Sequence, residues 1–201
     1  MRLFYSPGAC SLSPHIVLRE AGAAYQLERV DLKTHTTASG ADFYGINPKG
    51  YVPTLQLEDG RVLTEGPAIV QFLADRAPDT HLAPAPGTFE RAQLQEWLNY
   101  IGTELHKSFS SLFNSKLPAE VKETTLAGLH KKLDYLSREL SGRKFLLGDT
   151  FTVADAYLYT ILRWTRLFKI DLSGWPAIHE YIARVGQRPA VRASLQEEGL
   201  S

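Results

Sequence analysis

The first part of the chain alternates short apolar runs with one helical pattern. Residues 2–5 form an apolar run typical of a strand, and residues 25–32 alternate apolar and polar positions with a period of two. Between them, apolar residues recur at helical spacing, and Gly22 is suited to ending that helix. This order predicts two parallel strands joined by a right-handed crossover. The apolar face of the helix comprises Ile16, Val17, Leu18 and Ala21.

Polar and glycine-rich residues follow at 33–50, which we predict to be a loop with a short helix near 41–44. Two further short runs, 51–57 and 61–64, flank an Asp-Gly turn and predict an antiparallel hairpin. A helix then opens near Glu65. The predicted unit is an α/β, thioredoxin-like domain with a mixed four-stranded sheet, over residues 1–80. Whether the peptide bond before Pro53 is cis or trans stays open at this point.

The second half of the chain has only helical patterns. A proline-rich linker at 81–87 separates it from the first half, so we expect an all-α domain over residues 88–201. The helix after the linker carries apolar residues on one face as far as about Leu112, and the next spans 119–142. A helix that is apolar nearly all round follows Thr152 and is expected to be central and buried. Two short helices, each opened by a proline, close the chain.

Thr152 and Asp155 have the spacing of a capping box. The Thr152 side chain would cap the first turn of the helix, and the Asp155 carboxylate would reach back to residue 152. We therefore predict a structural role for both residues.

Composition narrows the function. The 201 residues carry 22 basic and 22 acidic side chains, which argues against a bulk electrostatic nucleic-acid binder. No apolar stretch is long enough to span a membrane, and no signal peptide is evident at the N-terminus. A single cysteine fits a reducing compartment, so we expect a cytoplasmic location. The six histidines lack metal-ligand spacing, and no metal site is predicted.

That single cysteine, Cys10, follows a Pro-Gly turn and precedes the first predicted helix. Helix N-termini favour anions, so the pKa of a thiol placed there can fall from about 8.5 to roughly 3.5–7.5. The alternative is that Cys10 is a small buried hydrophobic residue.

Several motifs together resemble one family. The residues are Tyr5 to Pro14, Asn47-Pro48-Lys49-Gly50-Tyr51-Val52-Pro53, Leu63-Thr64-Glu65-Gly66-Pro67-Ala68-Ile69, Trp97-Leu98-Asn99-Tyr100, Glu104-Leu105-His106-Lys107 and Phe151 to Tyr157. In this order along the whole chain, they resemble the bacterial beta-class glutathione transferases. The resemblance implies the glutathione transferase fold, in which the thioredoxin-like half holds glutathione.

The resemblance also implies roles for individual residues. Cys10 would lie at the glutathione sulfur and form a mixed disulfide with it, and His106 would act beside it as a general base or as a cation that lowers the thiol pKa. The family often has Ser at the position of Gly66, so a side-chain hydroxyl contact to glutathione is lost here. The family also often has Lys near position 35, and here the glycyl carboxylate would be contacted by His35 or Lys33. The implied glutathione-binding residues are Cys10, His35, Val52, Pro53, Glu65, Gly66, Asn99, Thr103, Glu104, His106 and Lys107, with Asn99, Thr103 and Glu104 contacting glutathione of a neighbouring subunit. The implied electrophile site includes Ala9, Phe109 and Trp164.

The expected function is a homodimeric glutathione S-transferase that conjugates glutathione, its co-substrate, to small hydrophobic electrophiles. Glutathione and the electrophile are the expected partners, and no permanently bound cofactor, nucleic acid or membrane is expected. Two alternatives remain. One is a monothiol, glutaredoxin-like redox protein, since Cys10-Ser11-Leu12-Ser13 lacks a second cysteine. The other is a non-enzymatic binding protein on the same fold.

Overall fold

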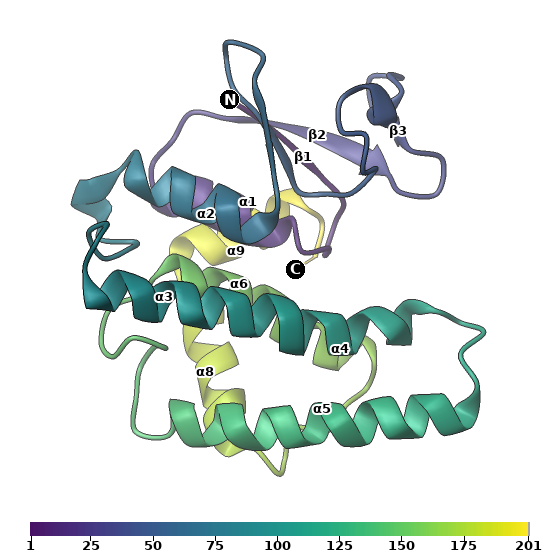
Figure 1. Cartoon of the computed structure of the whole chain (residues 1–201), viewed down its shortest axis with the longest axis vertical. Helices are drawn as coiled ribbons and strands as arrows, with labels where there is room; N and C mark the ends of the chain where they lie inside the picture. Colours follow the sequence, from purple (N-terminus) through teal and green to yellow (C-terminus); the bar gives the residue numbers. More distant parts are fainter. Residues whose placement is uncertain (201) are drawn as a thin grey trace. The chain divides into compact units, whose positions relative to one another are not determined.

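The computed structural model describes residues 1–200 and divides them into two compact units (Figure 1). One unit contains residues 1–83 together with residues 188–200, and the other contains residues 84–187. The C-terminal segment therefore folds with the first unit, whereas the sequence pattern had placed it in the helical domain.

The first unit is built on a mixed sheet with the strand order β3-β2-β1-β4-β5. β1 runs parallel to β2, and the other neighbouring strands are antiparallel. The predicted β-α-β unit and hairpin are confirmed, but the sheet has five strands instead of four. The additional strand, β3, is only two residues long and lies in the region predicted to be a loop. The strands are β1 (Arg2–Tyr5), β2 (Gln26–Asp31), β3 (Thr36–Thr37), β4 (Thr54–Gln56) and β5 (Val62–Thr64).

Helices α1 (Leu12–Glu20) and α2 (Gly66–Asp75) pack against each other on one side of this sheet (Figure 1). The C-terminal helix α9 (Pro189–Glu197) packs against α1. A cluster of buried residues joins β1 and β2 to the short 3-10 helix η1 (Phe43–Gly45). Its members are Phe4, Val30, Phe43 and Val52, and Ala9 and Ile46 pack against them. Another 3-10 helix, η2 (Pro78–Thr80), follows α2.

The second unit is all-helical, as predicted. Its elements are α3 (Phe89–Tyr100), η3 (Ile101–His106), α4 (Lys107–Ser110), η4 (Ser111–Phe113), α5 (Ala119–Leu140), α6 (Val153–Leu162), α7 (Trp164–Leu167) and α8 (Pro176–Gly186). Every residue of α6 is buried, which confirms its predicted central position. The helix predicted to run from Thr88 to about Leu112 is interrupted, because η3 has π-helical geometry.

The predicted capping box opens α6. The Asp155 carboxylate accepts hydrogen bonds from the Thr152 N–H and hydroxyl, each at 2.9 Å. It also accepts from the Leu146 N–H and from the Tyr181 hydroxyl, both at 2.9 Å. This buried carboxylate therefore joins the start of α6 to the loop before it and to α8.

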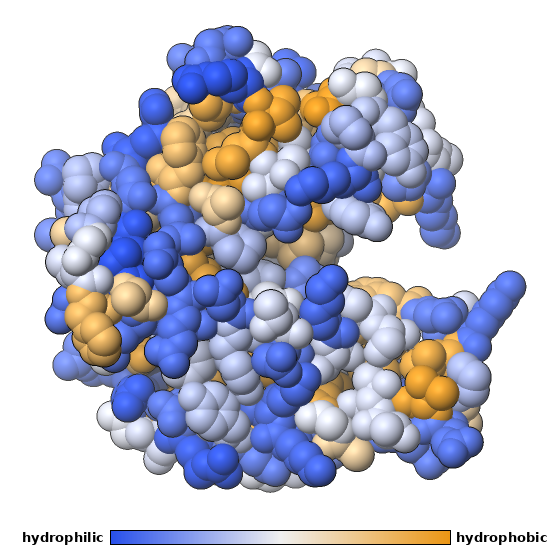
Figure 2. Space-filling model, viewed as in Figure 1, coloured by the Kyte–Doolittle hydropathy of each residue, from blue (hydrophilic) through white to orange (hydrophobic). Residues whose placement is uncertain are grey.

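Hydrophilic side chains cover much of the face seen in Figure 2, with smaller hydrophobic patches between them. None of the helices within residues 1–200 is both long and apolar enough to cross a membrane. The large hydrophobic side chains that remain exposed are Leu32, Tyr44, Tyr51, Val62, Phe89, Phe113, Val121, Tyr135 and Leu167.

Candidate functional site

The loop that carries Cys10 is held by hydrogen bonds to its own backbone. The Ala9 N–H donates to the Ser6 carbonyl at 3.0 Å, and Gly8 has a φ of 72°, which L-residues rarely adopt. The Ser11 hydroxyl accepts from the Ser6 N–H at 3.1 Å and donates to the Ser6 carbonyl at 3.2 Å. Ser11 thus closes the loop, and its side chain does not cap α1 as a serine at this position usually would.

The Cys10 thiol donates a hydrogen bond to the Val52 carbonyl, with an Sγ–O distance of 3.3 Å. The Val52-Pro53 peptide bond is cis. Asn47 is buried and fixes the neighbouring backbone, since its side-chain amide donates to the Tyr51 carbonyl at 2.8 Å and to the Thr54 hydroxyl at 3.0 Å. The structure therefore places the cysteine beside Val52, as expected from the sequence.

The expected lowering of the Cys10 pKa is wrong. Burial of the thiol group raises its pKa to about 12, and the Glu65 carboxylate acts in the same direction. The N–H groups of Cys10 and Ser11 at the start of α1 do lower the pKa, as expected for a helix N-terminus, but they are outweighed. At neutral pH the thiol is protonated.

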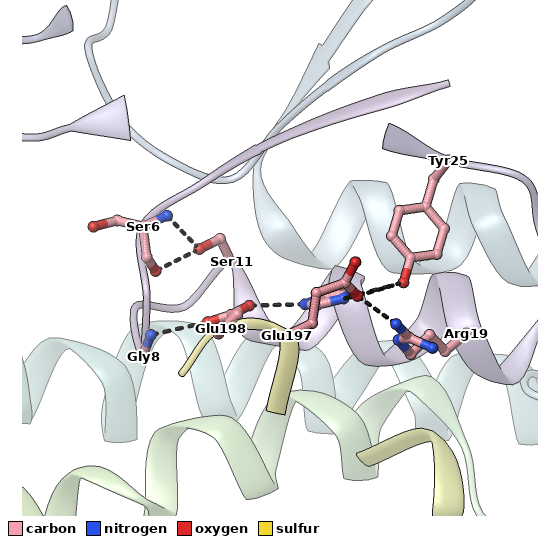
Figure 3. Close-up of polar contacts among 8 residues, drawn as sticks. Ser6, Gly8, Ser11, Arg19, Tyr25, Glu197 and Glu198 are labelled. Carbon is pink, nitrogen blue, oxygen red and sulfur yellow. Dashed lines mark hydrogen bonds and ion pairs between the residues drawn. The ribbon is translucent and has the colours of Figure 1, made fainter. Parts of the chain in front are cut away.

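A buried polar network ties this loop to the C-terminal segment (Figure 3). Glu198 accepts a hydrogen bond from the Gly8 N–H at 2.9 Å and pairs with Nδ1 of the fully buried His15 at 2.9 Å. Glu197 accepts from the Tyr25 hydroxyl at 3.1 Å, lies 3.0 Å from His15 Nε2 and pairs with Arg19. Residues from both ends of the chain thus hold the backbone two residues before Cys10.

Glu65 and Gly66 lie at the start of α2. Glu65 has a φ of 69°, unusual for a residue with a side chain, and two thirds of that side chain is exposed. Its carboxylate pairs with the Lys49 ammonium at 2.6 Å. A Cβ atom added at Gly66 would meet only Pro53 Cγ, at 3.7 Å, so a serine would fit there.

His35 also has a positive φ, of 52°, and its ring lies 4.4 Å from the Tyr44 ring, centroid to centroid. Its Nδ1 atom is buried and has no hydrogen-bond partner among the described residues. Both rings pack against Gly50, where a Cβ would come within 2.7 Å of Tyr44 and 3.1 Å of His35. Gly50 is therefore required for this stacking.

In the helical unit, His106 Nδ1 shares a hydrogen bond of 2.7 Å with the Tyr157 hydroxyl. Burial, with a contribution from the Lys107 charge, lowers the pKa of His106 to about 4. The imidazole is therefore neutral at pH 7, which contradicts the expected cationic role and leaves the role of a base. The His106 ring lies 5.0 Å from the Trp164 ring, within an aromatic cluster that also contains Phe109, Phe113 and Phe168.

The other predicted binding residues of this unit lie on or beside η3. Asn99, Thr103, Glu104 and Lys107 are exposed. The Glu104 carboxylate pairs with the Lys132 ammonium at 3.0 Å. Thr103 donates its hydroxyl hydrogen bond to the Asn99 carbonyl at 3.0 Å, which satisfies a carbonyl in the irregular helix.

Comparison with known proteins identifies the family. The model of the glutathione S-transferase N-terminal domain matches residues 8–76, and that of the C-terminal domain matches residues 100–189. The chain is 48% identical to glutathione S-transferase GstA of Escherichia coli O157:H7 over 200 residues, with both proteins covered completely. This chain belongs to the glutathione S-transferase family.

Solved structures agree with this assignment and with the predicted beta class. A beta-class glutathione S-transferase of Sphingomonas chungbukensis superposes with a TM-score of 0.97 and is 45% identical, with both chains covered completely. A sphingomonad glutathione S-transferase complexed with glutathione has a TM-score of 0.96, 45% identity and the same coverage.

The sequence analysis did not identify three residues that pair with predicted site residues of this transferase. Lys49 pairs with Glu65, Tyr157 with His106, and Lys132 with Glu104. Lys49 and Tyr157 lie within the motifs that carried the resemblance, but nothing in the sequence paired them with Glu65 and His106. Lys132 lies on α5, 28 residues from Glu104, and no local pattern connects the two. Among residues 1–200, no group of three or more His, Cys, Asp or Glu side chains is placed to hold a metal ion.

The raised pKa of Cys10 predicts slow alkylation of the free transferase. With a pKa of about 12, roughly three units above that of an ordinary thiol, the thiolate fraction at pH 7 falls about a thousandfold. A more basic thiolate is also more nucleophilic, which offsets part of the loss in reaction rate. Iodoacetamide should therefore react with Cys10 about thirtyfold more slowly than with a free cysteine peptide. The rate should rise about tenfold per pH unit between roughly pH 6 and 9, where the thiolate fraction is small.

Mass spectrometry of the intact chain measures this rate directly, because Cys10 is its only cysteine. A rate that reaches a plateau between about pH 5 and 8 would show a low-pKa thiolate and contradict the desolvation argument.

Proposed function

We propose that this member of the family transfers glutathione to small hydrophobic electrophiles. The observation that carries the proposal is the meeting of the Cys10 thiol with the Val52 backbone at 3.3 Å. Glu65 and Gly66 complete a polar surface in the same unit. Its parts match two portions of a thiol peptide: backbone groups suit the cysteinyl residue that carries the sulfur, and a carboxylate suits the γ-glutamyl ammonium.

In the proposed reaction, the glutathione thiol loses its proton and the thiolate attacks an electrophilic carbon, from which a leaving group such as chloride departs. Neutral His106 is the proposed base, because an unprotonated imidazole can accept a proton; with a pKa of about 4 it holds that proton only transiently at pH 7. The residues proposed for the electrophile remain Ala9, Phe109 and Trp164; Phe109 and Trp164 are buried within the aromatic cluster, in which Phe113 is the exposed ring.

Cys10 adds thiol exchange to this chemistry. Its thiolate would attack the disulfide of oxidised glutathione, forming a mixed disulfide and releasing one glutathione thiolate. Glutathione itself is the proposed co-substrate, bound through the glutathione-contacting residues expected from the sequence. The proposed assembly is a homodimer in the cytoplasm, in which Asn99, Thr103 and Glu104 contact glutathione of the partner subunit.

The test is turnover of reduced glutathione with a panel of electrophiles that includes a chlorinated aromatic compound. We expect formation of the aromatic thioether, with release of one chloride per conjugate. Binding of glutathione without turnover would favour a binding protein on this fold. Thiol exchange alone, abolished by Cys10→Ala, would favour the glutaredoxin-like alternative.

A further inference from the structure

The C-terminal helix α9 ends in a rigid turn. The Gly199 N–H donates to the Gln196 carbonyl at 3.1 Å, and the Leu200 N–H donates to the Leu195 carbonyl at 2.8 Å. Together with the φ of 70° at Gly199, these two hydrogen bonds form a Schellman motif, which closes the end of a helix. The motif fixes the backbone on both sides of Gly199, and therefore the positions from which the side chains of Glu198 and Leu200 extend.

Both of these side chains reach Gly8, in the loop before α1. Glu198 Oε2 accepts a hydrogen bond from the Gly8 N–H at 2.9 Å (Figure 3). Leu200 lies against the same residue, since a Cβ atom built at Gly8 would be 3.5 Å from Leu200 Cδ2. Glycine adopts positive and negative φ about equally readily, so the φ of 72° at Gly8 needs such contacts to be selected.

The Glu198 side chain is fully buried and has a second partner that holds it in place. Its Oε1 atom pairs with Nδ1 of His15 at 2.9 Å. The His15 ring is also fully buried, on α1, and its Nε2 atom lies 3.0 Å from Glu197 Oε2. The Glu198 carboxylate therefore cannot turn away from Gly8 without breaking hydrogen bonds in a region closed to water.

The chain leads from Gly8 to the thiol through Ala9. Ala9 packs against the buried cluster that joins β1, β2 and η1, and this cluster includes Val52. The next residue, Cys10, places its sulfur 3.3 Å from the Val52 carbonyl oxygen. A different conformation at Gly8 would move Ala9 out of the cluster and the sulfur away from Val52.

We infer that Glu198 is a positioning residue for Cys10, which holds the sulfur buried against the Val52 carbonyl by fixing the Gly8 N–H. The last residues of the chain thus control the reactivity of a thiol near its first residues. The restraint slows reagents that need only an exposed thiol. It favours oxidised glutathione, because the sulfur is already aligned beside the backbone groups proposed for the cysteinyl part of that peptide. This second effect rests on the proposed function, whereas the first does not.

The experiment measures two reactions of Cys10 at pH 7 by mass spectrometry of the intact chain: alkylation by iodoacetamide and mixed-disulfide formation with oxidised glutathione. Glu198→Ala should raise the alkylation rate about tenfold, because the loosened loop exposes the thiol to water and its pKa falls. The ratio of the disulfide-exchange rate to the alkylation rate should fall at least about tenfold, since the alignment is lost. Taking the ratio removes the effect of the thiolate fraction, which is common to both reactions.

Two further variants separate the bond to Gly8 from the rest of the network. In Glu198→Gln the side-chain carbonyl can still accept from Gly8, and the amide can donate to His15 Nδ1. Glu197→Ala is the matched control, because it removes the neighbouring carboxylate, whose partners are His15, Arg19 and Tyr25. Both variants should keep the two rates within about twofold of those of the wild type.

The inference is wrong if Glu198→Ala leaves the alkylation rate or the ratio of the two rates unchanged. It is also wrong if Glu198→Gln or Glu197→Ala changes the rates as much as Glu198→Ala does. If Glu198→Ala does not fold, the Gly8 amide of the wild type decides. Its hydrogen should exchange with deuterium at least about a hundredfold more slowly than that of an exposed loop amide, and unprotected exchange would overturn the inference.

The two arms of the experiment also separate this inference from the proposed function. A wild-type protein that forms no mixed disulfide with millimolar oxidised glutathione would refute the proposed thiol exchange. The alkylation rates of the variants would still decide whether Glu198 positions Cys10.

Discussion

Asp155→Ala is expected to lower the free energy of unfolding by about 4 kcal/mol, a large effect for a single substitution. The fully buried carboxylate accepts four hydrogen bonds, from the Leu146 N–H, the Thr152 N–H and hydroxyl, and the Tyr181 hydroxyl. Alanine leaves these donors without an acceptor in a region closed to water, and each buried unsatisfied donor costs about 1–3 kcal/mol. The loss is smaller than the sum of the four because the loop before α6 can relax.

Chemical denaturation followed by far-ultraviolet circular dichroism measures this change, with Asp149→Ala as the matched control. Asp149 is exposed and pairs with an exposed lysine, so its removal should cost about 0.5 kcal/mol or less. If Asp155→Ala does not fold, Tyr181→Phe tests the same network with one donor removed, at an expected cost of about 1 kcal/mol. Unfolding free energies of Asp155→Ala and wild type within about 1 kcal/mol of each other would contradict the proposed role of this carboxylate.

Much of the fold could be predicted because local pattern and final structure agree. The period-two strand at 25–32, the Asp-Gly hairpin and the capping box at Thr152 each depend on residues close in sequence. The strand β3 could not be predicted, since two threonines carry no periodicity. The π-helical turn at 101–106 could not be predicted either, because its apolar residues have nearly the spacing of an α-helix.

The candidate site was predicted less completely, because its electrostatics depend on packing. The sequence places Cys10 at a helix N-terminus, and the N–H groups there do favour the thiolate. Desolvation and the Glu65 carboxylate, which lies 55 residues further along the chain, outweigh them. The sequence likewise does not show that Glu198, near the other end of the chain, accepts a hydrogen bond from Gly8.

Glu65→Gln is expected to reduce kcat/KM for glutathione by about tenfold to a hundredfold, the largest functional effect that we expect. Glutamine has nearly the shape of glutamate and keeps an acceptor oxygen, but it lacks the negative charge that would hold the γ-glutamyl ammonium. The change should also lower the pKa of Cys10, because the Glu65 carboxylate contributes to raising it. The dependence on the electrophile concentration should stay the same, since Glu65 has no expected contact with that substrate.

Calorimetric titration of reduced glutathione into the wild-type protein and into Glu65→Gln tests the central claim, that the surface around Cys10, Val52 and Glu65 is a glutathione site. We predict one glutathione bound per wild-type chain and a Kd at least about tenfold higher for the variant. Equal affinities for the two proteins, or no binding to the wild type at millimolar glutathione, would contradict that claim.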